Sequence, residues 1–257
     1  MVIRWRFFAF LVCCSAWTYN QTVQVLDTFT DSDESCIYLP GRPSRLEYLV
    51  VLQLNPEEYE TAMNTGYRKF GPLLFRTVCE GCRECRSIRI PMEDFRPDRS
   101  QRRALKRNAD LIVRFGKPIV DKIRLNLYNR YHESQNTRKG WPPAEKTAQD
   151  YAFSFLHNPV PAVEISIWEG QALRAVVLTD ITPTVVSGVY HYHDPDLAER
   201  SLGTFAILQT LELAKHMGKP WAYFGYFVAD CASLSYKARF RPCELLGDDG
   251  IWRPFVD

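Results

Sequence analysis

Three closely spaced segments in the second half of the chain limit its possible folds more than any other feature. In the first of them, residues 163–168, apolar and polar residues alternate with the two-residue period of a half-buried β-strand, and the other two are further strand candidates. Turn-forming residues separate the segments, which favours an antiparallel meander. These strand segments are residues 163–168, 172–179 and 184–192.

A largely apolar helix is expected to follow the meander over residues 195–217, closed by Gly218. A strand at 220–226, a short helix at 231–238 and a hairpin turning at 248–250 complete this half. A meander followed by helix, strand, helix and strand predicts the α+β class, with an antiparallel-rich mixed sheet.

The first half of the chain shows shorter elements. A buried strand at 47–54 and a helix at 56–65 precede three strand candidates at 67–70, 73–78 and 86–91. Two helices are then predicted, a basic one with Ser100 as its N-cap and an amphipathic one over 119–135, with a break at 115–118 between them. The polar, turn-rich residues 136–146 are a candidate domain boundary or mobile loop.

The N-terminal residues 1–17 resemble a secretory signal, because Arg4 and Arg6 precede a short apolar run. A misjudged start codon is the alternative explanation, and the run is too short to span a membrane. No other apolar run is long enough to cross a bilayer, so we expect no stable membrane association.

Positive charge is concentrated in one part of the chain although the net charge is only +2. Residues 96–139 hold 13 Lys and Arg against 4 Asp and Glu, while the remaining residues hold 19 against 26. Such a block indicates a binding surface for a polyanion, and a solvated helix face is the alternative. The cations of its first part are Arg96, Arg99, Arg102, Arg103, Lys106 and Arg107.

A second cationic cluster follows the strand at 220–226. Lys237, Arg239 and Arg241 are interleaved there with the aromatic residues Tyr236 and Phe240. Cations mixed with rings suit a ligand that has both phosphates and stackable bases.

Three cysteines, Cys79, Cys82 and Cys85, have the C-x-x-C-x-x-C spacing that lets thiolates share one metal ion. Cys36 is the candidate fourth ligand. The pattern predicts a structural zinc site or an iron–sulfur cluster, and three reduced thiols on a loop are the alternative.

Two further groups carry potential chemistry. Arg200, Ser201 and Gly203 open the long helix, where free backbone N–H groups favour an anion. His191 and His193 share one face of a strand, and could bind a metal, act as a base or form a structural pair.

The chain resembles the aminoacyl-tRNA–protein transferases of the N-end rule, in particular their bacterial aspartate/glutamate leucyltransferase branch. The resemblance spans almost all of residues 36–255. It is carried by CIYLPGR (36–42), GYRKFGPLLFR (66–76), CEGCREC (79–85), FRPDRSQRRALKRN (95–108), VYHYHDPDLAERSLGTF (189–205) and GYFVADCASLSYKARFRPCELL (225–246).

This resemblance implies three segments: an extension at 1–24 outside the family pattern, a cysteine-containing domain at 25–110, and a catalytic domain at 111–257 like those of the GNAT acetyltransferases. Two departures are visible. Phe205 replaces the Gly or Ala of the GNAT coenzyme A loop, and residues 230–234 differ from the family's Gly-Cys-x-Lys-Met segment.

The resemblance further implies a cytoplasmic enzyme that transfers leucine from leucyl-tRNA to proteins with N-terminal Asp or Glu. Arginyl transfer to the same acceptors, a coenzyme A-dependent acetyltransferase and a non-catalytic nucleic-acid-binding module are the alternatives. Aminolysis of an activated ester requires positioning more than a nucleophile, so no cofactor is expected to take part in the reaction.

Residue roles follow from this scheme. Tyr226, Asp230, Tyr236 and Lys237 are the catalytic candidates, among which the sequence does not choose a base. The expected tRNA or substrate contacts are Arg96, Arg99, Arg102, Arg103, Arg107, Arg200, Ser201, Gly203, Arg239 and Arg241.

Overall fold

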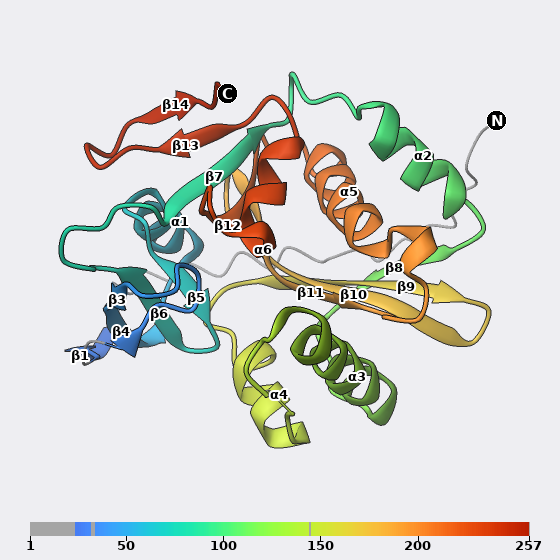
Figure 1. Cartoon of the computed structure of the whole chain (residues 1–257), viewed down its shortest axis with the longest axis horizontal. Coiled ribbons are helices and arrows are strands. Elements are labelled where there is room, and N and C mark those ends of the chain that lie inside the picture. Colours follow the sequence, from blue (N-terminus) through green and yellow to red (C-terminus); the bar gives the residue numbers. More distant parts are fainter. Residues whose placement is uncertain (1–23, 32–33, 144, 257) are drawn as a thin grey trace.

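The meander expected from the sequence forms one end of an eight-stranded sheet in the computed structural model, which describes residues 24–31, 34–143 and 145–256 (Figure 1). The strand order is β14-β13-β7-β12-β11-β10-β9-β8, and all pairs are antiparallel except β11 with β12. The strands are β7 Arg86–Pro91, β8 Ile112–Gly116, β9 Ala162–Glu169, β10 Ala172–Ile181, β11 Val185–His193, β12 Trp221–Phe227, β13 Glu244–Leu246 and β14 Trp252–Pro254.

Helices cover both faces of this sheet. The helix α5 (Leu202–His216) packs on one face, and α3 (Lys122–Lys139) with α4 (Ala148–Phe155) packs on the other (Figure 1). Each face of the sheet has its own hydrophobic core, and neighbouring residues of β10 point into different cores. Val177 packs in the core on the α5 side, and Val176 packs in the core on the α3 side. The result is an α+β architecture in which meander, helix and parallel strand follow the expected GNAT-like order.

A smaller four-stranded sheet lies beside the first one and has the order β1-β4-β6-β5. Helix α1 (Pro56–Asn64) contributes Tyr59 and Met63 to a core that also contains Tyr223 of β12, so the two sheets share packed residues. The segment boundary at residue 110 stays a prediction. The strands of this sheet are β1 Gln24–Thr30, β4 Leu46–Gln53, β5 Arg68–Phe70 and β6 Leu73–Thr77, and a two-stranded ribbon pairs β2 Glu34–Ser35 with β3 Pro43–Ser44.

Strands β11 and β12 separate after a short parallel pairing. They pair only from Val185 with Trp221 to Ser187 with Tyr223, although both strands continue. The pairing of β12 with β7 is also irregular between Tyr223 and Tyr226. Gly225 at this irregularity has a φ of +68°, a conformation that favours glycine. The carboxyl ends of two central strands are therefore free to border a binding site.

Several sequence-based boundaries were wrong in informative ways. The basic helix α2 (Arg99–Arg107) is capped by Asp98, whose carboxylate accepts a hydrogen bond from the backbone N–H of Gln101. Ser100, the predicted cap, instead lies inside the helix. Residues 195–201 form a turn and the short 3₁₀ helix η1 (Ala198–Arg200), so the long helix begins only at Leu202.

Other elements were missed. Helix α3 continues to Lys139 and ends at the left-handed Gly140, so its last turn was assigned to a loop. Helix α4 and the edge strands β1 and β8 were not predicted. Residues 1–23, which hold the signal-like segment, lie outside the described part of the chain. Within the described residues, no helix is both long and apolar enough to traverse a lipid bilayer.

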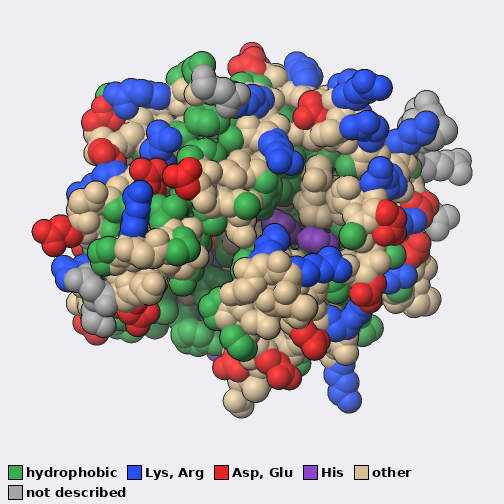
Figure 2. Space-filling model, in the orientation of Figure 1, with side chains coloured by type: hydrophobic (Ala, Val, Ile, Leu, Met, Phe, Trp, Pro, Cys, Tyr) green, Lys and Arg blue, Asp and Glu red, His purple; other side chains and the backbone are tan. Residues whose placement is uncertain are grey.

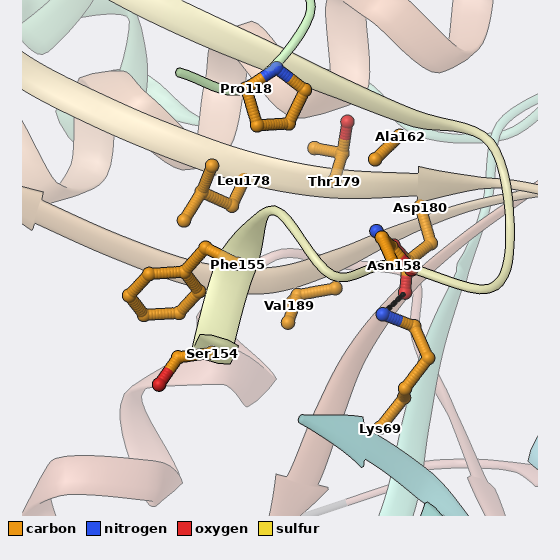
Figure 3. A pocket seen from close by; sticks show the side chains of 10 residues that line it. All are labelled: Lys69, Pro118, Ser154, Phe155, Asn158, Ala162, Leu178, Thr179, Asp180 and Val189. Atoms are coloured by element: carbon orange, nitrogen blue, oxygen red, sulfur yellow. Dashed lines mark hydrogen bonds and ion pairs between the residues drawn. The ribbon is translucent and has the colours of Figure 1, made fainter. Parts of the chain in front are cut away.

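A small cavity of about 10 Å³ lies between β5, β10 and the end of α4 (Figure 3). Lys69 and Asp180 form an ion pair there with an Nζ–Oδ2 distance of 3.2 Å, and both side chains are at most 2% exposed. Asn158 donates a hydrogen bond of 2.9 Å to the other oxygen of Asp180. The cavity is large enough for about one water molecule, and the ion pair ties the smaller sheet to the larger one.

Candidate functional site

Histidine side chains lie at the bottom of a hollow in the middle of one face of the protein, and Lys and Arg side chains border this hollow (Figure 2). His191 and His193 of β11 stack with an interplanar angle of 14°. A Cβ atom added to Gly203, in the first turn of α5, would lie 3.3 Å from His193 and 3.9 Å from His191. We call the space in front of His191, His193 and Gly203 the central hollow.

The two histidines are neutral near physiological pH. Burial, followed by the charges of His193 and Lys237, lowers the pKa of His191 to about 3. Burial and the charge of Lys139 lower the pKa of His193 to about 4. The charge of Lys237, after β12, acts on His191, and the charge of Lys139, at the end of α3, acts on both histidines. The histidines share one strand face, as the sequence predicted.

Lys237 lies in the 3₁₀ helix η2 (Tyr236–Arg239), next to the separated end of β12. Its Nζ donates a hydrogen bond of 2.6 Å to the carbonyl of Tyr226. Burial and the nearby charge of Arg68 lower the pKa of Lys237 to about 7. A Cβ atom at Gly225 would lie 3.8 Å from the Lys237 Nζ and 4.0 Å from the Arg68 Nε, so both cations converge on one point.

Arg68 is 7% exposed and was not among the residues singled out from the sequence. Its guanidinium donates hydrogen bonds to the carbonyls of Tyr67 and Gly225 and lies 5.1 Å from the ring centre of Tyr226. Its buried Nε has no hydrogen-bond partner. In the described part of the chain, neither Arg68 nor Lys237 forms an ion pair with a carboxylate. The motif GYRKFG contains Arg68, so the sequence did offer a signal.

The basic helix α2 lies beside this site because polar side chains at its two ends hold it there. The amide of Gln101 donates a hydrogen bond of 3.0 Å to the carbonyl of Arg239 in η2. Asn108 donates one of 2.7 Å to the carbonyl of Arg200, and Arg107 contacts Ser201 at 3.2 Å. The structure thus brings together three groups that the sequence analysis had treated separately: α2, the segment before α5, and η2.

The predicted cations differ in how free they are. The cations of α2 that are exposed to solvent are Arg99, Arg102, Arg103, Lys106 and Arg107. Of these, Arg102 also donates a hydrogen bond to the carbonyl of Pro97, and Arg107 contacts Ser201 as described above. Arg200 instead pairs with Asp110 at 2.8 Å and with Glu169 at 3.3 Å, so its charge is already compensated. Arg96 donates hydrogen bonds to the carbonyls of Glu93 and Phe95, and Arg241 to that of Phe255.

The catalytic candidates predicted from the sequence differ in how buried they are. Tyr226 is 7% exposed, donates its hydroxyl hydrogen bond to the carbonyl of Gly66, and has its pKa raised to about 12 by burial. Burial likewise raises the pKa of Tyr236. A phenol that keeps its proton at neutral pH can donate a hydrogen bond but is a poor base. Asp230 is exposed in the turn after β12, so its role stays a prediction.

The cysteine cluster lies near the same site. Burial, and after it the proximity of Cys36, Cys79, Cys82 and Cys231, raises the pKa of Cys85 to about 12. Backbone N–H groups of Leu39 and Arg45 donate to the sulfur atoms of Cys36 and Cys79 at 3.4 and 3.3 Å.

These donors suit thiolates, and four thiols within mutual electrostatic range match the donor set of zinc or an iron–sulfur cluster. Among the described residues, however, no three His, Cys, Asp or Glu side chains are arranged closely enough to hold a metal ion. The metal site therefore stays a prediction.

Two family models match the chain. The one described as arginine-tRNA-protein transferase, N terminus, matches residues 34–103, and the corresponding C-terminus model matches residues 123–247. Together with an α+β fold and a cationic site, these matches define an aminoacyltransferase, and the chain belongs to the arginine-tRNA-protein transferase family.

Its relatives narrow the assignment within the family. The chain is similar to the aspartate/glutamate leucyltransferase of Halorhodospira halophila, with 36% identity over 85% of this chain and 92% of that protein. It is 37% identical to the aspartate/glutamate leucyltransferase of Chromohalobacter salexigens, over 93% of this chain and 97% of that protein. Among solved structures, L-PGS from Bacillus licheniformis aligns with a TM-score of 0.47 and 12% identity over 83% of this chain and 79% of that one.

Proposed function

We propose that this protein transfers leucine from leucyl-tRNA to the N-terminal Asp or Glu of acceptor proteins in the cytoplasm, which marks them for N-end rule degradation. The names of its relatives support the donor and the acceptor. The structural observation that carries the proposal is that the buried Arg68 and the partly buried Lys237 converge at Gly225, without a carboxylate partner among the described residues.

A buried charge is costly unless an opposite charge pairs with it. Arg68 comes from β5 and Lys237 from η2, so two distant parts of the chain bring unpaired positive charge to one place. The side-chain carboxylate of an N-terminal Asp or Glu supplies the missing negative charge. Its amide analogues, Asn and Gln, do not, which explains a preference for acidic acceptors.

The reaction is aminolysis of an ester. The acceptor's α-amine attacks the leucyl carbonyl carbon, a C–N bond forms, the C–O bond to the terminal ribose breaks, and the ribose oxygen takes the proton that the amine releases. An α-amine has a pKa of about 7.7–8.0, so a useful fraction is already neutral. Arg68 and Lys237 hold the acceptor side chain and thereby position its amine, and positioning supplies much of the acceleration.

The surroundings of the central hollow favour leucine over arginine as the transferred group. Asp194 follows His193 and is the carboxylate that acts on its pKa. Arg130 and Arg174 already engage both oxygens of Asp194, at 2.9 and 2.7 Å. A pocket for an arginyl group requires a free carboxylate, whereas an apolar leucyl group requires none.

The donor's RNA is assigned to the exposed cations of α2. Their side chains point into solvent beside η2 and the first turn of α5, so a phosphate backbone lying along α2 brings its 3′ end to the central hollow. We further propose that Cys36, Cys79, Cys82 and Cys85 close around a structural zinc ion or iron–sulfur cluster. Elemental analysis of the purified protein for zinc, iron and acid-labile sulfide tests this part.

The decisive experiment incubates the protein with tRNA charged separately with leucine and arginine, and with peptides that begin with Asp, Glu, Asn or Lys. We expect a mass increase of one leucine on the Asp and Glu peptides alone. Arginine addition would replace the donor assignment, and acetylation with acetyl-coenzyme A in place of tRNA would reject the proposal.

A further inference from the structure

The C-terminal half of α3 lies near the central hollow, because Tyr131 of this helix contacts His193 at 5.0 Å. The proposed function leaves the end of α3 without a role. Gly140 ends the helix in the left-handed conformation, and its N–H group donates to the carbonyl of Asn136 at 2.9 Å. The side chain of Asn136 donates to the carbonyl of Trp141 at 2.5 Å. These bonds fix residues 138–141, which we call the α3 rim, in one conformation.

The α3 rim presents two exposed cations and one aromatic ring. Arg138 and Lys139 are exposed, and in the described part of the chain neither forms an ion pair with Asp or Glu. The Nζ of Lys139 lies 5.8 Å from the ring centre of Trp141. Trp141 itself rests edge-on against Tyr131 at 6.3 Å, and Tyr131 contacts His193 at 5.0 Å.

The charges of the α3 rim act on the central hollow. Lys139 lowers the pKa of both His191 and His193, and Arg138 lowers that of His193. Cations of two elements thus act on these histidines: Arg138 and Lys139 of the α3 rim, and Lys237 of η2, which acts on His191. Cations in the last turn of a helix also interact favourably with the helix dipole. That explanation accounts for Arg138 and Lys139 but not for the supported tryptophan ring beside them.

We infer that the α3 rim binds the unpaired 3′ strand of the donor RNA, with Arg138 and Lys139 on its phosphates and Trp141 stacked on a base. Cations combined with a stacking ring are the usual means of holding single-stranded nucleic acid. The inference rests on the proposed function only in naming an RNA as the donor. It divides the work between two surfaces: α2 holds the paired stem, and the α3 rim holds the unpaired end that enters the hollow.

The test measures binding of two fluorescent RNA hairpins with the same stem, one blunt and one with a four-nucleotide unpaired 3′ tail. The wild-type protein should bind the tailed hairpin more tightly. The double variant Arg138→Ala/Lys139→Ala should lose this preference, and its log–log salt slope for the tailed hairpin should fall by about 1.4, at about 0.7 per phosphate contact. Trp141→Ala should weaken tailed binding about tenfold and leave blunt binding unchanged.

Two control variants separate the surfaces. Lys215→Ala removes an exposed lysine from the last turn of another helix, α5, about 18 Å along that helix from Gly203, and should change neither affinity. Arg102→Ala/Arg103→Ala on α2 should weaken both hairpins equally. A double α3 rim variant that keeps the wild-type preference for the tail, or a wild-type protein without that preference, overturns the inference.

These outcomes are independent of the proposed function. A protein that binds the tail through the α3 rim but transfers no leucine keeps the inference and loses the function. A protein that transfers leucine, but whose α3 rim variants bind both hairpins as the wild type does, supports the proposed function and contradicts the inference.

Discussion

Two neighbouring cations on β5 are both buried, yet the rest of the molecule treats them differently. Lys69 is 5% exposed and pairs with Asp180, which Asn158 also holds. Arg68 is 7% exposed and meets a second cation, Lys237, with no carboxylate to balance either of them in the described structure. Burial alone therefore does not separate a structural charge from a functional one, whereas the presence or absence of a partner does.

The difference follows from the two faces of a strand. Adjacent residues of β5 point in opposite directions, so Lys69 reaches toward β10 while Arg68 reaches toward Gly225 of β12. One contact fastens the smaller sheet to the larger one. The other keeps positive charge where two strands have separated, at a cost in stability that a negatively charged ligand can offset.

The largest effect on stability is expected at the paired cation. Lys69→Met leaves the buried carboxylate of Asp180 without its counter-charge and should lower the free energy of unfolding by about 3–5 kcal/mol. Lys237→Met removes a charge that has no carboxylate partner and should change it by about 1 kcal/mol or less. Urea unfolding of both variants measures the contrast, and equal losses would remove the distinction between the two cations.

The largest effect on activity is expected at the unpaired cations. Lys237→Met should lower kcat/KM for a peptide beginning with Asp by about 100-fold, because a buried charge pair is worth about 2–5 kcal/mol when one partner is removed. For the matching peptide that begins with Asn, which has no charge to lose, the variant should equal the wild type. A uniform loss for both peptides would assign Lys237 to the donor side instead.

A smaller, pH-dependent effect sharpens the same comparison. Burial and Arg68 lower the pKa of Lys237 to about 7, and only its protonated form attracts a carboxylate. The kcat/KM for an acidic acceptor should therefore fall as the pH rises through about 7, against the rise caused by deprotonation of the acceptor amine. In Lys237→Arg the charge persists, so this fall should vanish. Profiles between pH 6 and 8.5 with identical decreases in both proteins would exclude Lys237 as its source.

The sequence predicted the sheet better than it predicted the site. The meander was recognisable because residues 163–168 alternate between apolar and polar side chains, and because turn residues separate the three strand segments. The last turn of α3 was missed because Asn136, Thr137 and Gly140 suggest a loop, while the hydrogen bond from Asn136 to Trp141 is a contact that sequence does not display. The cap of α2 was misplaced because Asp98 and Ser100 are both good capping residues.

Arg68 illustrates why the site was harder to predict. It lies next to Lys69 in the sequence, and both residues have the same charge and a similar length. Only the separation of β11 from β12 and the irregularity at Gly225 decide that Arg68 meets Lys237, 169 positions further along the chain. In contrast, the cationic clusters at α2 and η2 were recognised from the sequence. A run of charged residues on the surface can be seen in the sequence itself, because it does not depend on which distant residues come into contact.

Gly225 offers a way to separate shape from charge. Its left-handed conformation disfavours other residues, and a single methyl group there would occupy the gap between the two cations while leaving both of them in place. A chain with alanine at this position would keep its electrostatic attraction for an acidic acceptor but lack the room to admit it. The absence of a side chain at Gly225 thus leaves the space beside Arg68 and Lys237 open to a ligand.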